Sequence, residues 1–210
     1  MSVLRGLPDA PRNLLIAITR CPVVDLCQSG SAHSCSAIVR SQAGQDAGKF
    51  QVPEPWSGHI ATAPILFVSS NPSIDPKEAY PTATWSNHER DDFFANRFQA
   101  TPEPWVDSRM RPRLAPTDPA TWRPKGTRFW WAARARATEL STRSAVAGDD
   151  FALTEVVHCK SSGEVGVDDA QEECVRRWLK PVVEASGSRV VVLLGAHAKA
   201  ARVLRAVLDG

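Results

Sequence analysis

The sequence predicts an α/β protein in which helices cover a mostly parallel sheet. Short apolar runs typical of buried strands alternate along the 210 residues with longer stretches typical of helices. The runs at 65–69, 151–157 and 189–194 read ILFVS, FALTEVV and RVVVLL, and they are rich in β-branched and large apolar residues. The last is apolar after its first residue, as in strands that a parallel sheet buries on both faces. We therefore expect one α/β domain over residues 1–210.

Helical patterns flank these runs. Helices are expected at 13–20, 89–98, 127–140, from 168 onward and at 196–208. Asp168 is followed three residues later by Gln171, which indicates a capping box at the start of its helix. Residues 1–60 have no clear periodicity beyond the first helix, and 101–125 contain six prolines, so both are expected to be largely irregular.

Composition is that of an ordinary globular protein, with 43% hydrophobic and 23% charged residues. No apolar run approaches the roughly 20 residues that span a bilayer. Pro8, Asp9 and Pro11 interrupt any signal-peptide pattern at the N-terminus. We expect a cytoplasmic protein with no membrane contact and no obligate protein partner.

Basic residues are concentrated in the middle of the chain although the net charge is only +2. Residues 109–143 contain nine basic and two acidic residues, with tryptophans interleaved. This pattern suits a phosphate backbone and unstacked bases, so DNA is the expected partner. A solvated basic face with tryptophans in the core is the alternative. The candidate DNA-binding residues are Arg109, Arg111, Arg113, Lys125 and Arg128.

Five cysteines form a candidate metal site. They are Cys21, Cys27, Cys35, Cys159 and Cys174. Disulfides are not expected in a reducing compartment, and thiolates bind zinc or iron–sulfur clusters. No Cys-x-x-Cys pair is present, so their spacing alone equally allows buried free cysteines without a metal.

The strand at 65–69 ends in an unusual way. It runs into Ser70, Asn71, Pro72 and Ser73, so a buried strand leads directly to an asparagine. Asn-Pro is a common turn sequence. In an open α/β sheet, however, ligands bind at the carboxyl ends of strands. Asn71 is therefore either a turn former or a functional residue.

The order of these motifs resembles that of the uracil-DNA glycosylase superfamily, closest to its iron–sulfur (family 4-like) branch. Residues 69–73 (SSNPS) are similar to the superfamily's first motif in its Asn-containing form. Residues 154–162 (TEVVHCKSS), followed by Cys174, resemble the branch's N-V-V-K-C-R-P-P and second cysteine. Residues 190–200 (VVVLLGAHAKA) resemble the strand and helix that come next, so the match covers roughly 60–205.

The resemblance implies a three-layer α/β/α sandwich with a short central, mostly parallel sheet. It also implies a [4Fe–4S] cluster, with Cys159 and Cys174 as two ligands and two of the three N-terminal cysteines as the others. Asn71 is implied to orient water for base excision, with backbone N–H groups near it and Ser73 serving the departing base. Tyr80 or Trp85 is the expected aromatic partner of an extruded base.

Two features depart from the branch. Glu155 stands where the branch has the asparagine that reads uracil, and a carboxyl group can mimic an amide only when it is protonated. We therefore expect weak activity on uracil at neutral pH, which Glu155→Asn strengthens. The second motif, a His-Pro or Asn-Pro loop, is not found before Gly210, so we expect it to be absent or to follow that residue.

The sequence thus predicts a DNA-repair glycosylase that hydrolyses the N-glycosidic bond of a deaminated or damaged base. Asn71 is the candidate catalytic residue. The candidate base-binding residues are Ser70, Ser73, Tyr80, Trp85 and Glu155. Two alternatives remain at this point: a non-catalytic nucleic-acid-binding protein of the same fold, and a zinc-stabilised α/β protein of unrelated function.

Overall fold

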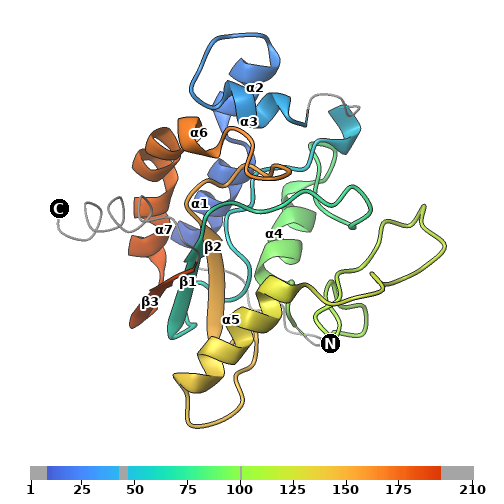
Figure 1. Ribbon diagram of the computed structural model, residues 1–210, viewed down its shortest axis with the longest axis vertical. Coiled ribbons are helices and arrows are strands. Elements are labelled where there is room, and N and C mark those ends of the chain that lie inside the picture. Colours follow the sequence, from blue (N-terminus) through green and yellow to red (C-terminus); the bar gives the residue numbers. More distant parts are fainter. Residues whose placement is uncertain (1–8, 43–46, 100, 195–210) are drawn as a thin grey trace.

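Three parallel strands form an open sheet at the centre of the protein (Figure 1). They are β1 (Ile65–Ser69), β2 (Phe151–Glu155) and β3 (Val190–Leu193), in the order β2-β1-β3. The computed structural model describes residues 9–42, 47–99 and 101–194. The predicted α/β fold and the parallel sheet are confirmed, and β1 has the predicted bounds.

Side chains of β1 alternate between two buried clusters. Leu66 and Val68 belong to the larger cluster, whereas Ile65 and Phe67 belong to the smaller one. Successive side chains of a strand point to opposite faces, so apolar residues at every position bury both faces of this strand. The pairing of β1 with both β2 and β3 places it in the middle of the sheet.

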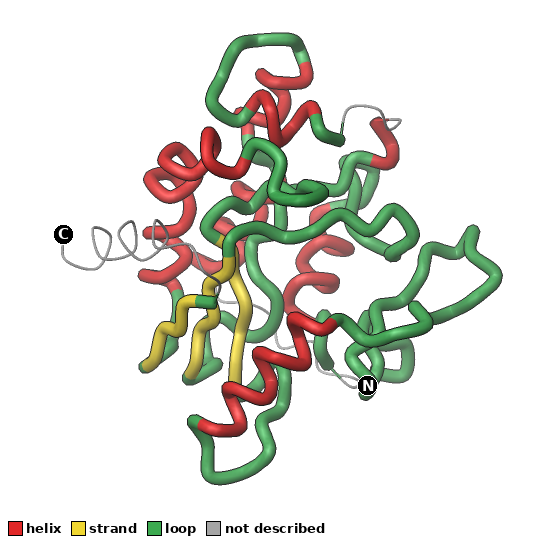
Figure 2. Tube along the Cα trace, viewed as in Figure 1, coloured by secondary structure: helices red, strands yellow, loops and turns green. Residues whose placement is uncertain are grey.

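Helices cover both faces of this sheet. On one face, α5 (Arg128–Glu139) contributes Trp130, Ala133 and Ala137 to the smaller cluster. Helix α1 (Asp9–Thr19) packs its Leu15 and Ile18 in the larger cluster. The remaining helical elements are α2 (Pro22–Gln28), α3 (Ser36–Arg40), a 3-10 turn (Ala47–Lys49), α4 (Asn87–Asn96), α6 (Val167–Cys174), a π-helical turn (Val175–Leu179) and α7 (Lys180–Ala185). Figure 2 shows long irregular segments between these elements, including the Pro-rich connection.

The start of α6 differs from the prediction. The helix begins at Val167 with Gly166 at its N-cap, and no side chain caps it, so the predicted capping box at Asp168 is wrong. Gly166 has a φ of +74°, and a Cβ on it would lie 2.4 Å from the backbone nitrogen of Ile38. Glycine is therefore required by both conformation and space. Its lack of a side chain lets α6 pack directly on α3.

Two other predictions also differ from the structure. Residues 1–60, expected to be largely irregular beyond the first helix, also contain α2 and α3. β2 ends at Glu155, two residues earlier than expected, although the N–H groups of Val156 and Val157 still bond to the carbonyls of Ser69 and Ser70. The expected helix at 196–208 lies outside the described residues.

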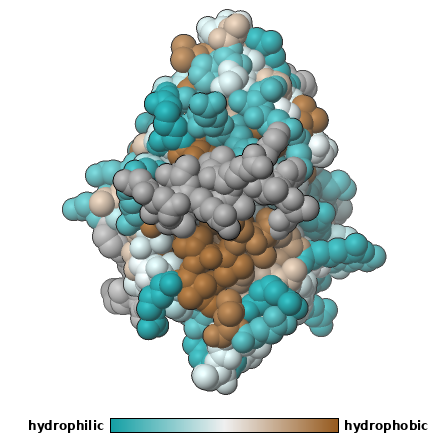
Figure 3. All heavy atoms as spheres, turned by 60° about the vertical axis from the view of Figure 1, so that its left-hand side comes forward, coloured by the Kyte–Doolittle hydropathy of each residue, from teal (hydrophilic) through white to brown (hydrophobic). Residues whose placement is uncertain are grey.

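β3 is more exposed than its apolar sequence predicted. It lies at the edge of the sheet, and Val190 and Leu193 are 43% and 40% exposed. Figure 3 shows an apolar area on the side of the molecule where β3 lies. The prediction was wrong because apolar composition does not distinguish an edge strand from a central one. None of the helices in the described part of the chain has the length and apolar character needed to cross a membrane.

Candidate active site and cysteine cavity

The strands β1 and β2 bring their polar ends to one edge of the sheet. Ser69 is paired in register with Glu155, and each is the last residue of its strand. The Ser69 hydroxyl donates a hydrogen bond to Glu155 Oε2. Asn71 follows Ser69 by two residues, so it lies beside this pair, as expected where the carboxyl ends of parallel strands meet.

The Asn71 side chain is held in one orientation. Its Nδ2 donates to Ser161 Oγ at 2.9 Å, to the Pro72 carbonyl at 3.2 Å and to the Cys159 carbonyl at 3.5 Å. Because a carbonyl oxygen can only accept, the NH₂ group must face these partners. Among the described residues, Asn71 Oδ1 has no hydrogen-bond partner, so the amide oxygen is available to a ligand.

Asn71 and Glu155 line the same cleft, which has a volume of about 680 Å³. Ser70 and Ser73, two of the predicted base-binding residues, also line it. Phe129, in the first turn of α5, contributes an aromatic side chain to the lining. Sequence analysis missed this residue, although the GTRFWW stretch marks an aromatic start of a helix.

Tyr80 and Trp85 lie elsewhere. Both line a separate cavity of about 700 Å³. Tyr80 is buried, and its hydroxyl donates to Glu54 Oε2 at 3.2 Å. Trp85 packs edge-on against Phe93. The structure therefore does not bring these two rings together with Asn71, whereas Phe129 lines the same cleft as Asn71.

A buried network of opposite charges borders the cleft. Arg97 forms ion pairs with Glu54 at 2.7 Å and Glu78 at 2.5 Å, and the Lys160 ammonium lies 3.8 Å from each carboxylate. All four side chains are less than 10% exposed. Removing one partner of such a network leaves an uncompensated buried charge, which costs about 3–5 kcal/mol. The network thus gives the cleft a rigid polar wall without a net charge.

Glu155 is outside these ion pairs. Burial, reinforced by the nearby negative charge of Glu54, raises the pKa of Glu155 to about 8. Burial alone would also raise the pKa of Glu54, but Arg97 and Lys160 outweigh it and hold that pKa below its usual value. The two carboxyl groups therefore differ at neutral pH. Glu54 is a paired carboxylate, whereas Glu155 is mostly protonated and can both donate and accept a hydrogen bond.

The predicted DNA-binding residues fall into two groups. Arg109, Lys125 and Arg128 are exposed. Arg111 and Arg113 are partly buried and form ion pairs with Asp107 at 2.7 Å and Glu103 at 3.4 Å. None of the five lines the cleft. Arg123, which was not among them, does line it, and its Nε lies 3.5 Å from Asp75.

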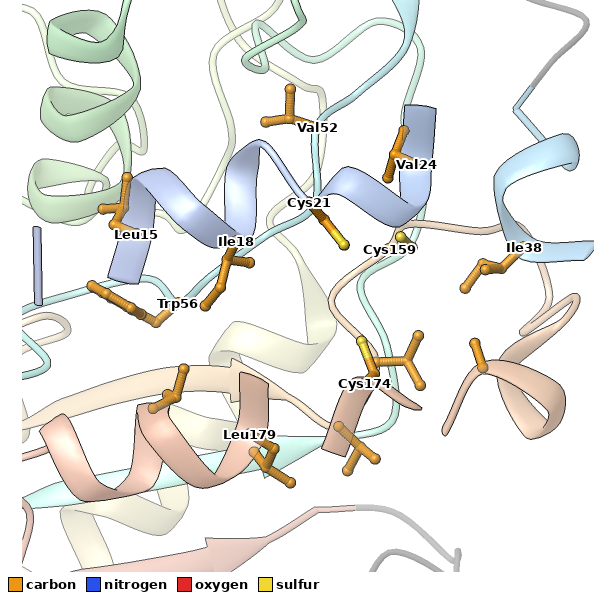
Figure 4. Packing of buried hydrophobic residues seen from close by; sticks show 14 of the residues in the cluster. Leu15, Ile18, Cys21, Val24, Ile38, Val52, Trp56, Cys159, Cys174 and Leu179 are labelled. Atoms are coloured by element: carbon orange, nitrogen blue, oxygen red, sulfur yellow. The ribbon is translucent and has the colours of Figure 1, made fainter. Parts of the chain in front are cut away.

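Four of the five cysteines line one small cavity, to which His158 and Cys159 of the 156–161 loop belong. The four cysteines are Cys21, Cys35, Cys159 and Cys174. All are buried and none is in a disulfide. Figure 4 shows the side chains of Cys21, at the junction of α1 and α2, and Cys174, at the end of α6, directed toward each other, with Cys159 beside them.

The cysteine cavity disfavours thiolates unless a cation is present. Burial raises the pKa of Cys35 to about 11 and that of Cys174 to about 12, and it raises the pKa of Cys159 well above its ordinary value. A bound metal would displace these protons. In the described ranges, no group of three or more His, Cys, Asp or Glu side chains is arranged to hold a single metal ion.

Cys27 stands apart from the four. It is buried, but it does not line the cavity, and its Sγ accepts a hydrogen bond from Ser36 Oγ at 3.7 Å. The cavity instead includes His158, which precedes Cys159 and is 1% exposed. The structure therefore brings four of the five cysteines to one cavity, and His158 lines this cavity with them.

Comparisons with known proteins do not assign the chain to a family. No family model matches it, and no curated protein is significantly similar to it. The resemblance to the uracil-DNA glycosylase superfamily therefore stays a prediction from the order of the motifs.

Proposed function

We propose that this protein binds DNA and hydrolyses the N-glycosidic bond of a deaminated or damaged base, with Asn71 orienting the attacking water. The observation that carries the proposal is the set of hydrogen bonds that fixes the orientation of the Asn71 amide. Its Nδ2 has three acceptors within 3.5 Å, while its Oδ1 is left to a ligand at the carboxyl edge of the sheet. A turn former needs no such fixed amide.

The amide oxygen can accept a hydrogen bond from water and direct the water's lone pair at the anomeric carbon. An amide is a poor base, so its contribution is positioning, and the bond to the base must break early through an oxocarbenium-like state. The departing base then carries negative charge, which is neutralised when the base takes up, through solvent, the proton that the attacking water loses. Within the described residues, the backbone N–H groups of Asn71 and Ser73 donate no hydrogen bond, so they can stabilise that charge.

Glu155 is placed to read the base. Uracil, hypoxanthine and xanthine each present a carbonyl oxygen beside an N–H group. A protonated carboxyl group offers one donor and one acceptor, which complements that edge, whereas a carboxylate offers acceptors only. The raised pKa of Glu155 supports the protonated form at neutral pH. Activity on uracil at neutral pH is therefore proposed to depend on the proton of Glu155. Phe129 is proposed as the aromatic partner of the base.

The proposal includes a [4Fe–4S] cluster, with zinc as the alternative. The four thiols of the cysteine cavity are the donors that such clusters use. A single zinc ion needs all its sulfurs at about 2.3 Å from one point, and no described group is arranged to hold one ion. The choice of a cluster over zinc follows the resemblance to the iron–sulfur branch. The role of the cluster would be structural: joining the α2–α3 segment to α6.

The test is single-turnover excision on oligonucleotides that contain uracil, hypoxanthine or xanthine, in single- and double-stranded form. We expect wild-type protein to release at least one of these bases and Asn71→Ala to lose about 100-fold or more in rate, as when a catalytic group is removed. Ser162→Ala, at an exposed position in the same loop region, is the matched control and should retain the rate. Wild-type protein that releases none of the three bases would refute the catalytic proposal.

A further inference from the structure

His158 has a defined tautomer. Its Nδ1 lies 2.7 Å from the backbone carbonyl oxygen of Glu54. Since that oxygen can only accept, Nδ1 carries the proton and Nε2 has a free lone pair. The ring cannot turn freely, because the residue is 1% exposed and its backbone N–H donates to Cys174 Sγ at 3.5 Å.

The other ring nitrogen has no partner. Nε2 is buried and accepts no hydrogen bond from any described residue. Buried polar atoms are nearly always satisfied, so a buried nitrogen without a partner requires an explanation. His158 is one of the residues that line the cavity of Cys21, Cys35, Cys159 and Cys174. A buried imidazole nitrogen without a partner, in a residue that shares a cavity with four thiols, is the observation from which a metal ligand is inferred.

The arrangement on the Nδ1 side also matches that of metal-binding histidines. Such residues usually donate the second ring N–H to a backbone carbonyl or a carboxylate, which fixes the tautomer and the direction of the ring. His158 makes this bond to Glu54 O. The neighbouring Glu54 side chain is engaged with Arg97, so only its carbonyl serves the ring.

We propose that His158 Nε2 binds an iron of the cluster, together with three of the four cysteines that line the cavity. This inference rests on the cluster in the proposed function. Four thiols and one imidazole line the cavity, which is one donor more than the four irons of a [4Fe–4S] cluster need. One thiol is therefore dispensable. Because a neutral imidazole replaces an anionic thiolate, the cluster is less negative and easier to reduce than one with four cysteine ligands.

Nitrogen ligation can be tested on the wild-type protein, so the test does not depend on a variant that folds. The protein is made with ¹⁵N-histidine, its iron content is measured, and the reduced cluster is examined by pulsed electron paramagnetic resonance. We expect the coupling of a directly bound imidazole nitrogen, which changes with the isotope. His33→Gln is the matched control: His33 is two residues from Cys35, but its Nδ1 accepts from the Cys35 backbone N–H and it does not line the cavity.

A cysteine series provides the second readout. Because Cys159 and Cys174 are both taken as ligands, the dispensable thiol is Cys21 or Cys35. One of the variants Cys21→Ser and Cys35→Ser is therefore expected to keep the wild-type iron content, and adding His158→Ala to that variant should remove the iron. His158→Cys, where it retains the cluster, should lower the midpoint potential. Iron-loaded protein without a histidine nitrogen coupling overturns this inference but leaves the cluster intact. Protein without iron after anaerobic purification overturns the cluster as well, so the two failures are distinguishable.

Discussion

The cleft at Asn71 and the cysteine cavity are both lined by residues of the loop at 156–161, and they differ in how their charges are balanced. In the cleft, Glu54 and Glu78 face Arg97 and Lys160, so the ionised groups are matched within the protein. In the cavity, four thiols are buried together. Glu173 and Arg177, which also line it, already form an ion pair with each other. The cleft can therefore receive a polar ligand as it stands, whereas the cavity's donors need a cation.

The loop at 156–161 connects the two sites residue by residue. The Cys159 thiol lines the cavity, while its carbonyl oxygen holds the Asn71 amide at 3.5 Å. His158 lines the cavity, and Lys160 lines the cleft. A centre bound to Cys159 would fix the loop that positions Asn71. A structural cluster and a catalytic amide can thus be coupled without sharing a ligand.

The largest effect is expected at the cysteines. Cys174→Ser should lose the iron and, with it, the stability gained by joining α6 to the N-terminal segment. Cys27→Ser should retain both, because Cys27 is also buried but lies outside the cavity. Iron content, visible absorbance and thermal unfolding of anaerobically purified protein check this. Equal iron loss in both variants would contradict the choice of four cysteines.

A smaller effect concerns Glu155 and folding stability. Its pKa is raised in the folded state from 4.5 to about 8, so the protonated form favours folding. This contribution is complete below pH 4.5 and is lost as the pH rises through 8. Glu155→Gln, which cannot ionise, should therefore become progressively more stable than wild type between about pH 5 and pH 9, by a few kcal/mol in free energy of unfolding.

Chemical denaturation of the two proteins across this pH range measures the difference directly. Taking the difference between the two proteins cancels groups such as Glu54, whose lowered pKa acts in the opposite direction. A gap that stays constant with pH would show that Glu155 is ionised in the folded protein.

The smallest effect is expected from the surface charges. Replacing Arg109, Lys125 and Arg128 with alanine should weaken DNA binding and flatten its salt dependence, by about 0.9 in log–log slope for each phosphate that is no longer neutralised. Replacing Arg111 and Arg113 should change the slope less, because both already pair with carboxylates. Fluorescence anisotropy at several salt concentrations compares the two variants. Identical slopes for both variants and wild type would place this segment away from the DNA.

Much of the sheet edge could be predicted from sequence, because it depends on local patterns. The apolar run of β1 and its abrupt polar end put Asn71 at the edge of a parallel sheet. Glu155 was singled out by the resemblance to the glycosylase branch, since its strand was expected to continue to residue 157. The pairing of Ser69 with Glu155 could not be predicted in detail, since register depends on contacts between distant segments.

The charge network was beyond sequence reasoning. Glu54, Glu78, Arg97 and Lys160 come from four separate loop or helix-end positions, and no local periodicity marks them. Tyr80 was expected at the cleft because the resemblance implies an aromatic residue there that stacks on the base. Its hydroxyl instead bonds to buried Glu54, which packs the ring beneath the network. Similarly, only the fold shows which cysteines converge.

The most direct test of the Asn71–Glu155 site is the pH dependence of single-turnover excision from a uracil-containing oligonucleotide. Wild type and Glu155→Asn should be compared from about pH 6 to pH 10. If a protonated Glu155 reads the base, the wild-type rate should be constant at low pH and should fall about tenfold per pH unit above about 8, following its pKa. Glu155→Asn carries a permanent donor and acceptor, so its rate should not fall there. Matching profiles for the two proteins, or a wild-type rate that rises through pH 8, would contradict the account.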